Sequence, residues 1–240
     1  AVNDLAAQGA DYIKISFEPG PGGWPILSFE EARTVTDAAH ERGLQVIAHV
    51  EDASYLDQAI DSGVDIITHI GYRWQGERLF TDMSNLTPDS TPFSNYDGYD
   101  ALITRMVEHV ALIPTLDVLI GERALDSAPA VGMTEVVRRF HERGGLVAVG
   151  DDYPLGVTQP GIPFGEIEHL LAAGLTPLEV ITAGTKNAAL VCGHGDDLGT
   201  LEAGKLADLI IVEGDPLEDL EALRNLKLVM IDGQIAFDYR

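Results

Sequence analysis

The feature that most constrains the fold is an alternation of short, β-branched apolar runs with amphipathic segments. The runs are apolar almost to their last residues, as expected for strands that are covered on both faces. Each run is followed by a segment of helical periodicity, in the case of 65–70 only after a long irregular stretch. Strand-then-helix repetition predicts an α/β fold with a parallel sheet and crossover helices. The five predicted strands cover residues 12–17, 44–50, 65–70, 110–115 and 146–152.

The clearest helix signal is a capping box. Ser28 is followed three residues later by Glu31, which predicts a helix that begins at Ser28 and extends to residue 42. Periodicity and bounding glycines or prolines predict further helices over residues 53–61, 99–109, 134–143, 163–173 and 177–191.

The pattern changes after about residue 195. Two apolar runs, 206–212 and 226–231, are followed by Asp232-Gly233 and a third short run at 234–237. Because Asp-Gly between two strands is a hairpin signal, this region is predicted to form a small antiparallel sheet. We therefore expect two parts, residues 1–195 and residues 196–240.

Charge and composition exclude several classes of protein. The chain has 39 Asp and Glu against 15 Lys and Arg, a formal net charge of −24, which argues against nucleic acid or an anionic membrane as a partner. No apolar stretch reaches the ~18 residues of a membrane-spanning helix. The location stays open, with a cytoplasmic one favoured, because we expect the true N-terminus to be missing. The single cysteine, Cys192, excludes an internal disulfide, and its apolar surroundings predict a buried thiol.

Four polar residues interrupt the apolar runs at or near their carboxyl ends. They are Lys14, His49, His69 and Asp152. In parallel α/β folds the active site lies at this edge of the sheet, and a desolvated polar group there needs a partner. Two imidazoles and a carboxylate suit Zn²⁺, Mn²⁺ or iron. Each residue alone also has an ordinary structural role, so the sequence pattern leaves a metal site and a structural arrangement open.

Tyr72 and Arg73 directly follow the third predicted strand. An arginine there has the geometry to hold a substrate carboxylate, so we take the pair as candidate substrate-binding residues. A solvated loop is the alternative.

Longer motifs carry a family resemblance over nearly the whole chain. The most specific is residues 199–209, which read Gly-Thr-Leu-Glu-Ala-Gly-Lys-Leu-Ala-Asp-Leu. Others cover residues 9–15, 38–43, 46–49, 59–69, 150–152, 173–177 and 185–189. With these motifs the chain resembles the amidohydrolase superfamily of metal-dependent hydrolases, in its imidazolonepropionase/prolidase-like branch. The resemblance implies a partial (β/α)8 TIM-like barrel, strands four to eight, with residues 196–240 as half of a composite β-sandwich.

The resemblance also implies a chemistry. Members cleave carbon–nitrogen bonds of amides, peptides or cyclic amides through a metal-bridging hydroxide, so a small-molecule or dipeptide-like substrate is expected. Two divalent metal ions are implied, Zn²⁺ first, with Mn²⁺, iron or Co²⁺ as alternatives. Lys14 matches the carbamylated lysine that bridges them, and His49 and His69 match ligands of the second metal. Asp152 matches the catalytic aspartate, which binds the first metal and transfers the proton.

Two departures from the family pattern leave alternatives open. The strand-one His-x-His pair is absent, so we expect the C-terminal part of a longer enzyme, whose site a missing N-terminal segment or another chain completes. A catalytically incompetent fragment and a mononuclear deaminase-type member are the alternatives, and a homo-oligomer is compatible with all three. The family usually has Thr or Ser before the aspartate, whereas Asp151 precedes Asp152 here, so Asp151 remains the alternative ligand.

Overall fold

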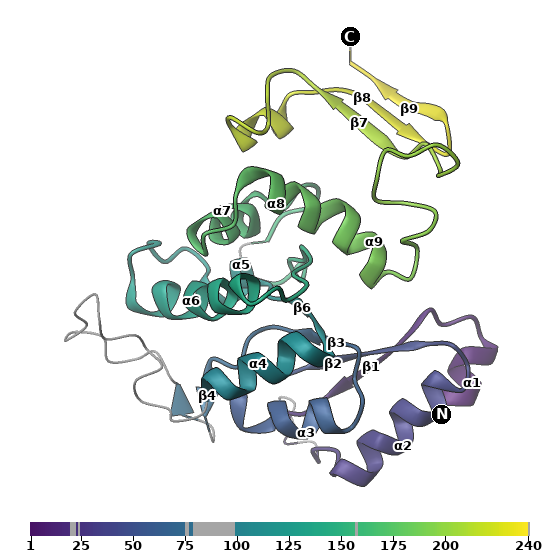
Figure 1. Cartoon of the computed structure of the whole chain (residues 1–240), viewed down its shortest axis with the longest axis vertical. Helices are drawn as coiled ribbons and strands as arrows, with labels where there is room; N and C mark the ends of the chain where they lie inside the picture. The colour runs from purple at the N-terminus through teal and green to yellow at the C-terminus, as the bar shows by residue number, and fades with distance from the viewer. Residues whose placement is uncertain (20–22, 24, 75–76, 79–98, 157, 240) are drawn as a thin grey trace.

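The computed structural model describes residues 1–19, 23, 25–74, 77–78, 99–156 and 158–239. Its central element is a parallel sheet of four strands in the order β1-β2-β3-β6, visible in the lower half of Figure 1. The strands are β1 (Tyr12–Ser16), β2 (Gln45–His49), β3 (Ile66–Thr68) and β6 (Ala111–Ile113). The predicted parallel sheet is thus confirmed for the first four runs.

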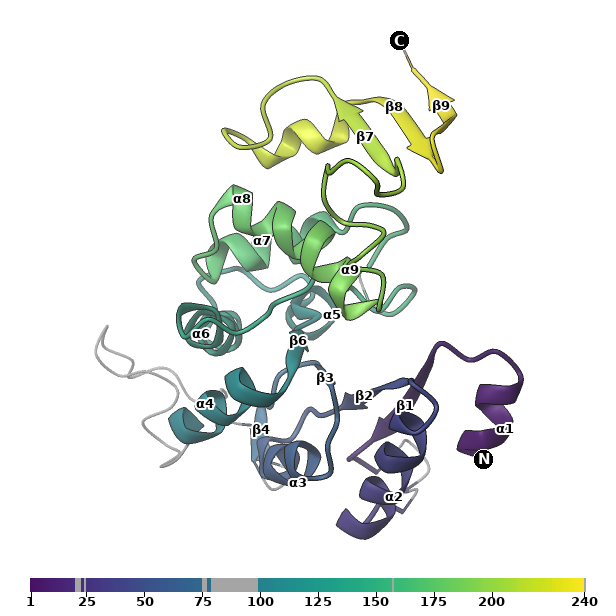
Figure 2. The same cartoon turned by 45° about the vertical axis from the view of Figure 1, so that its right-hand side comes forward.

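The helices form two groups around this sheet. Helices α2, α3 and α4 lie along one side of it, whereas α6 to α9 lie between it and the C-terminal strands (Figures 1 and 2). The bounds are α1 (Val2–Ala7), α2 (Phe29–His40), α3 (Leu56–Asp61), α4 (Tyr99–His109), α5 (Leu116–Ile120), α6 (Ala128–Glu142), α7 (Phe164–Ala172), α8 (Pro177–Thr182) and α9 (Ala188–Val191). A π-helical segment, Ala183–Asn187, joins α8 to α9.

Local signals explain where α2 begins. The Ser28 hydroxyl accepts from the Glu31 N–H at 3.3 Å, and the Glu31 carboxylate accepts from the Ser28 N–H at 2.8 Å. The predicted capping box is confirmed. The buried face of α2 contributes Ala32 and Ala39 to a core that also contains Phe17, Leu56 and Phe140 at 0% exposure.

The predicted fifth strand, residues 146–152, is wrong in extent. Its regular pairing is limited to one parallel bridge between Leu112 and Val147, with hydrogen bonds on either side of that bridge. One residue later the Val149 N–H donates to the carbonyl of Ala183, in the π-helical segment, at 3.2 Å. The pairing with β6 stops after Ala148, because the next donor toward the Ala148 carbonyl would be residue 114, a proline that has no N–H.

Other differences arise from contacts that are distant in sequence. Helix α5 and the two-residue strands β4 (Arg73–Trp74) and β5 (Glu77–Arg78) were not predicted. Cys192 is exposed rather than buried. It follows the last residue of α9, whose buried positions are Ala189 and Val191, so the thiol lies beyond the packed face of the helix.

The predicted C-terminal antiparallel sheet is confirmed. It has the order β7-β8-β9, with β7 (Leu209–Val212), β8 (Leu226–Ile231) and β9 (Gln234–Asp238). Asp232 and Gly233 have φ values of 49° and 72°, the left-handed pair that a tight hairpin needs. Every residue of β9 is exposed.

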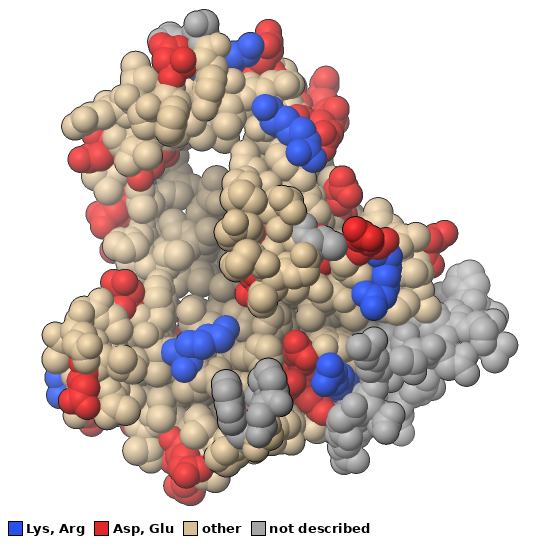
Figure 3. Space-filling model, turned by 180° about the vertical axis from the view of Figure 1, so that it is seen from behind, with Lys and Arg blue, Asp and Glu red and all other residues tan. Residues whose placement is uncertain are grey.

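The surface is predominantly acidic. Figure 3 shows Asp and Glu side chains scattered over the face it draws, with few Lys and Arg side chains between them. Among the described helices, none is both long and apolar enough to cross a membrane.

Candidate metal centre

The carboxyl ends of the parallel strands meet at one edge of the sheet. Ser16 pairs with His49, His49 with Thr68, and Thr68 with Ile113, so these residues form one row across the four strands. His69 is the next residue after this row. The predicted ligands from β2 and β3 are therefore neighbours because of the strand register.

His69 is the most constrained of the predicted ligands. It is 4% exposed, and its Nδ1 lies 2.6 Å from Thr115 Oγ1. Its Nε2 lies 3.6 Å from Oδ2 of Asp152. Burial, with the neighbouring His49 as a second cause, lowers the pKa of His69 to about 3, so the ring is neutral near pH 7. Its φ of 71° is left-handed, a strain that such sites often contain.

His49 lies beside His69. The two ring centroids are 4.4 Å apart in an edge-to-face arrangement. His49 Nε2 is 3.9 Å from Glu51 Oε1. Burial lowers the pKa of His49. The Lys14 charge lowers it further, whereas the carboxylates of Glu51 and Asp152 oppose the shift.

Lys14 extends from the middle of β1 toward the same edge. Lys14 as a whole is exposed to solvent, yet its ammonium nitrogen donates a hydrogen bond to Thr68 Oγ1 at 2.7 Å. Partial desolvation of this end lowers the pKa of Lys14, and the Asp152 charge opposes the shift. Asp152 has a left-handed φ of 56°. The charges of Lys14 and Asp152 therefore lie near enough to affect the pKa of His49.

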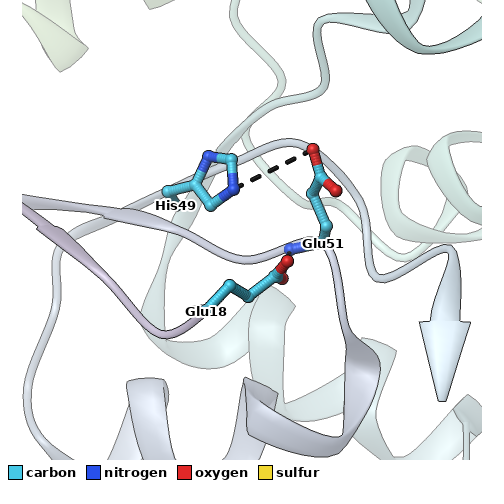
Figure 4. Close-up of side chains that lie close together, drawn as sticks. All are labelled: Glu18, His49 and Glu51. Atoms are coloured by element: carbon cyan, nitrogen blue, oxygen red, sulfur yellow. Dashed lines mark hydrogen bonds and ion pairs between the residues drawn. The ribbon is translucent and has the colours of Figure 1, made fainter. Parts of the chain in front are cut away.

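Glu51 is a site residue that the sequence prediction missed. Among the described residues, the only triplet of potential ligand atoms within 4.8 Å of one another belongs to Glu18, His49 and Glu51 (Figure 4). His49, His69 and Asp152 are more widely spaced. Glu18 Oε1 accepts from the backbone N–H groups of Glu51 and Asp52, which fixes it against the loop after β2. A carboxylate two residues after a strand-end histidine was the available signal.

The structure brings Tyr72 and Arg73 to Glu51. The Tyr72 hydroxyl donates to Glu51 Oε2 at 2.6 Å, and Arg73 Nη2 donates to the Tyr72 oxygen at 3.0 Å. Arg73 Nη2 is also 3.6 Å from Glu51 Oε2. Burial and the Glu51 contact raise the pKa of Tyr72 to about 12, so its hydroxyl stays protonated. Arg73 is thus already paired with a carboxylate of this chain.

A cavity of about 450 Å³ opens over these groups. Its polar lining includes the predicted His49, His69, Tyr72 and Asp152, whereas Lys14 and Arg73 are not among the lining residues. Arg123 lines the cavity and was not predicted. Its Nη1 donates to the carbonyl of Ile120 at 2.6 Å, which anchors it at the end of α5. The apolar wall comes from Val118, Leu119, Pro129, Met133 and Leu155.

The donor set fits a divalent cation. Neutral imidazole and carboxylate are suitable ligands for zinc and similar cations. The Nδ1 side of His69 is occupied by Thr115, so its Nε2 side faces Asp152 and the cavity. His49, His69 and Asp152 could hold such an ion, with Lys14 next to them, and so could the more closely spaced triplet of Glu18, His49 and Glu51.

Proteins of similar sequence and fold place the chain in a family. The model of the amidohydrolase family matches residues 3–236. The imidazolonepropionase of Caldanaerobacter subterraneus subsp. tengcongensis is 38% identical over 208 residues, which are 85% of this chain and 41% of that protein. The imidazolonepropionase of Haloarcula marismortui is 27% identical over 209 residues, 87% of this chain and 42% of that protein.

A crystal structure of a Xaa-Pro dipeptidase with bound methionine in the active site superposes with a TM-score of 0.75. The two are 27% identical, and the match covers 99% of this chain and 57% of that one. The chain belongs to the amidohydrolase family, as its motifs predicted. It spans about two fifths of the length of the curated relatives described above.

Proposed function

We propose that this chain carries part of the active site of a metal-dependent hydrolase that cleaves a carbon–nitrogen bond. The observation that carries the proposal is the convergence of His69 Nε2 on Asp152 Oδ2, 3.6 Å apart, with the His49 ring beside them and a cavity above. Family membership supports the reaction class.

For the architecture, we propose that residues 1–195 form strands four to eight of a (β/α)8 barrel and their helices. Residues 146–148 would take the place of one barrel strand, since they lie parallel to β6. Residues 196–240 would form half of a composite β-sandwich. The exposed Ile235 and Phe237 on β9 support this, because apolar strand residues are usually covered.

We propose two divalent cations, zinc first, as the cofactor. When bound, they supply an activated water and a Lewis acid for the scissile carbonyl. Lys14 is suited to carbamylation, because a lowered pKa leaves more of its amine neutral at a given pH. The neutral nitrogen adds to CO2 and releases a proton, which gives an anionic group able to bridge two cations. Two cations need more ligands than the side chains of Lys14, His49, His69 and Asp152 offer. We therefore propose that residues outside this sequence complete the centre.

Asp152 is the proposed proton carrier. It takes a proton from the attacking water and returns it to the leaving nitrogen, as general base and then general acid. His69 and His49 stay neutral at the working pH because burial lowers the pKa of each. They therefore serve as ligands and do not compete for that proton.

The cavity supports a dipeptide-like or N-acyl amino acid substrate. Its apolar wall suits an apolar side chain, and Arg123 offers a guanidinium on the same cavity for a free carboxylate. We propose Arg123 as the direct contact of the acidic end. Tyr72 would line the substrate site, and Arg73, the residue first expected in that role, would orient Glu51 and Tyr72.

Hydrolysis by the complete natural protein tests the proposal. It should be loaded with Zn²⁺ and given dipeptides, N-acetyl amino acids and cyclic amides, with release of the amine as the readout. Asp152→Asn should lower kcat about 10²–10⁴-fold, the usual contribution of a general acid–base residue. The matched variant Asp151→Asn should stay within a few-fold. An inactive wild type would contradict the function, and loss confined to Asp151→Asn would assign the proton transfer to that neighbour.

A further inference from the structure

Thr115 occupies a position that normally serves a helix. It directly precedes α5, where a Thr side chain usually accepts a hydrogen bond from a free N–H of the first turn. Here it forms no such bond. Its Oγ1 instead donates to the carbonyl of Pro114 at 2.8 Å and lies 2.6 Å from Nδ1 of His69. Thr115 is 1% exposed, so these contacts are shielded from water.

These two contacts determine which nitrogen of His69 carries the proton. A hydroxyl has one hydrogen, and in Thr115 that hydrogen points to the Pro114 carbonyl. With the hydrogen in that position the oxygen is left to accept, and its short contact with His69 then places a hydrogen on Nδ1. A neutral imidazole has one N–H, so Nε2 keeps its lone pair, on the side of Asp152 and the cavity.

Another element supplies the cap that Thr115 does not provide. Glu166, in α7, is fully buried, and its Oε2 accepts from the Asp117 N–H of α5 at 2.8 Å. The neighbouring Gly165 permits this approach, because a Cβ there would lie 2.3 Å from an oxygen of Asp117. Thr115 itself has a left-handed φ of 49°, an uncommon backbone conformation that needs support from its surroundings.

We propose that Thr115 is a positioning residue that holds His69 in the Nδ1–H tautomer with Nε2 facing the cavity, and that Glu166 caps α5 in its place. The inference deepens the proposed function. Only one part of it, the role of Nε2 as a metal ligand, rests on that function. The tautomer itself is a property of the metal-free chain.

Nitrogen-15 NMR of the metal-free 240-residue chain tests the tautomer directly. The ring signals of His69 are identified by their loss in His69→Gln. We expect a protonated Nδ1 and an unprotonated Nε2 in the wild type. Thr115→Val removes the hydroxyl at nearly constant volume and should shift His69 toward a mixture of tautomers, whereas Thr115→Ser should restore the wild-type pattern. A wild-type ring protonated on Nε2 overturns the inference without any variant.

A matched control separates positioning from general loss of packing. Thr134, in α6, is 7% exposed and donates its hydroxyl to the Ala130 carbonyl of its own helix at 2.9 Å. Thr134→Val should leave the His69 signals unchanged. If Thr115→Val does not fold, Thr115→Ala gives a second hydroxyl-free variant without a branched Cβ at the left-handed position. An unchanged tautomer in either folded variant contradicts the proposal.

Glu166 is tested by the same signals. Glu166→Gln retains an oxygen acceptor for the Asp117 N–H and should leave the tautomer of His69 unchanged. Glu166→Leu removes the acceptor, so α5 loses its cap and the tautomers should mix. If His69 keeps its signals in Glu166→Leu, Glu166 has no positioning role.

Zinc affinity provides the second readout and distinguishes this inference from the proposed function. Thr115→Val should weaken binding of Zn²⁺ about 10–100-fold, as loss of a ligand's orienting partner usually does, while Thr115→Ser and Thr134→Val stay close to wild type. If the complete natural protein binds no Zn²⁺ while the 240-residue chain shows the expected tautomer, the proposed function fails and the role of Thr115 stands. If the wild type and Thr115→Val bind Zn²⁺ equally tightly, the proposed function stands and the positioning role of Thr115 fails.

Discussion

The two sheets of this chain differ in how far their strands are buried. In the parallel sheet, Val46 and Ala48 of β2 are at 0% exposure and all of β3 is buried. In the C-terminal sheet, Ile235 and Phe237 of β9 are 55% and 57% exposed. The difference shows why the candidate chemistry lies on the first sheet, because polar groups at the ends of buried strands lose water and depend on one another.

Electrostatics separate the same two regions. Near the parallel sheet, burial moves the pKa of His69 to about 3 and that of Glu166 to about 8. In the C-terminal sheet, Lys227 Nζ pairs with Glu213 Oε2 at 2.6 Å. Glu213 is highly exposed, and the cation beside it lowers the pKa of its carboxyl. An exposed pair of this kind contributes little to stability, so we expect function to depend on the first region alone.

The largest expected effect is on stability. Phe140→Ala should lower the free energy of unfolding by about 3–5 kcal/mol, because it leaves a cavity at a fully buried position. Phe237→Ala, on exposed β9, should change it by less than about 1 kcal/mol. Urea denaturation measures both variants. If both variants lose the same free energy of unfolding, the C-terminal sheet is covered in solution and the two sheets do not differ in burial.

The next effect is on activity. In the complete natural protein, Lys14→Ala should lower kcat/KM more than about 100-fold, because loss of a ligand's partner alone costs 10–100-fold. Short carboxylates should partly restore the rate by replacing the carbamate. Lys227→Ala, which removes the exposed ion pair of the C-terminal sheet, should leave the rate unchanged.

Full activity of Lys14→Ala without added carboxylate would exclude a bridging role. That result would favour the mononuclear, deaminase-type alternative, in which no bridging lysine is needed.

Several features of the fold were predictable from sequence because their causes are local. The capping box at Ser28, the Asp232-Gly233 turn and the apolar runs of the strands all act within a few residues. Residues 146–152 have the same apolar pattern as a strand, but the register places Pro114, which has no N–H, where the next donor to this run is needed, and periodicity does not reveal that register.

The candidate site was predictable only in its strand-end residues. Glu51 and Arg123 were missed because both lie in loops, the first after β2 and the second after the five-residue helix α5. Thr115 was missed for another reason. It is the last residue of the predicted strand 110–115, and only the tertiary contact with His69 brings its hydroxyl to the candidate site.

A moderate effect is expected on the pH dependence of stability. Burial raises the pKa of Glu166 from 4.5 to about 8, so the folded chain holds a proton that the unfolded chain releases above about pH 4.5. The free energy of unfolding should therefore fall as pH rises between about 4.5 and 8, by at most about 1.4 kcal/mol per pH unit from this group. Glu166→Gln should flatten that slope.

Urea denaturation at several pH values measures the slope. Glu168→Gln, at an exposed position of the same helix, is the control and should keep the wild-type dependence. An equal slope in wild type and Glu166→Gln would show that Glu166 is not the group that titrates.

The smallest effect concerns substrate binding. Arg123→Met should raise KM about 3–10-fold for substrates with a free carboxylate and leave kcat nearly unchanged, because a uniform binding contact is lost. Substrates with an amidated end should show no change. If Arg73→Met raises KM for acidic substrates and Arg123→Met does not, Arg73 holds the carboxylate directly.

The central claim is that side chains from separate strands of the parallel sheet bind a divalent cation together. Zn²⁺ bound per chain, measured after equilibration with Zn²⁺ and removal of free ion, tests it most directly. The 240-residue wild type should retain at least one equivalent, His69→Gln should retain none, and His194→Gln, in an exposed loop, should match the wild type. A wild type without bound Zn²⁺, or a His69→Gln variant that keeps it, would contradict the claim.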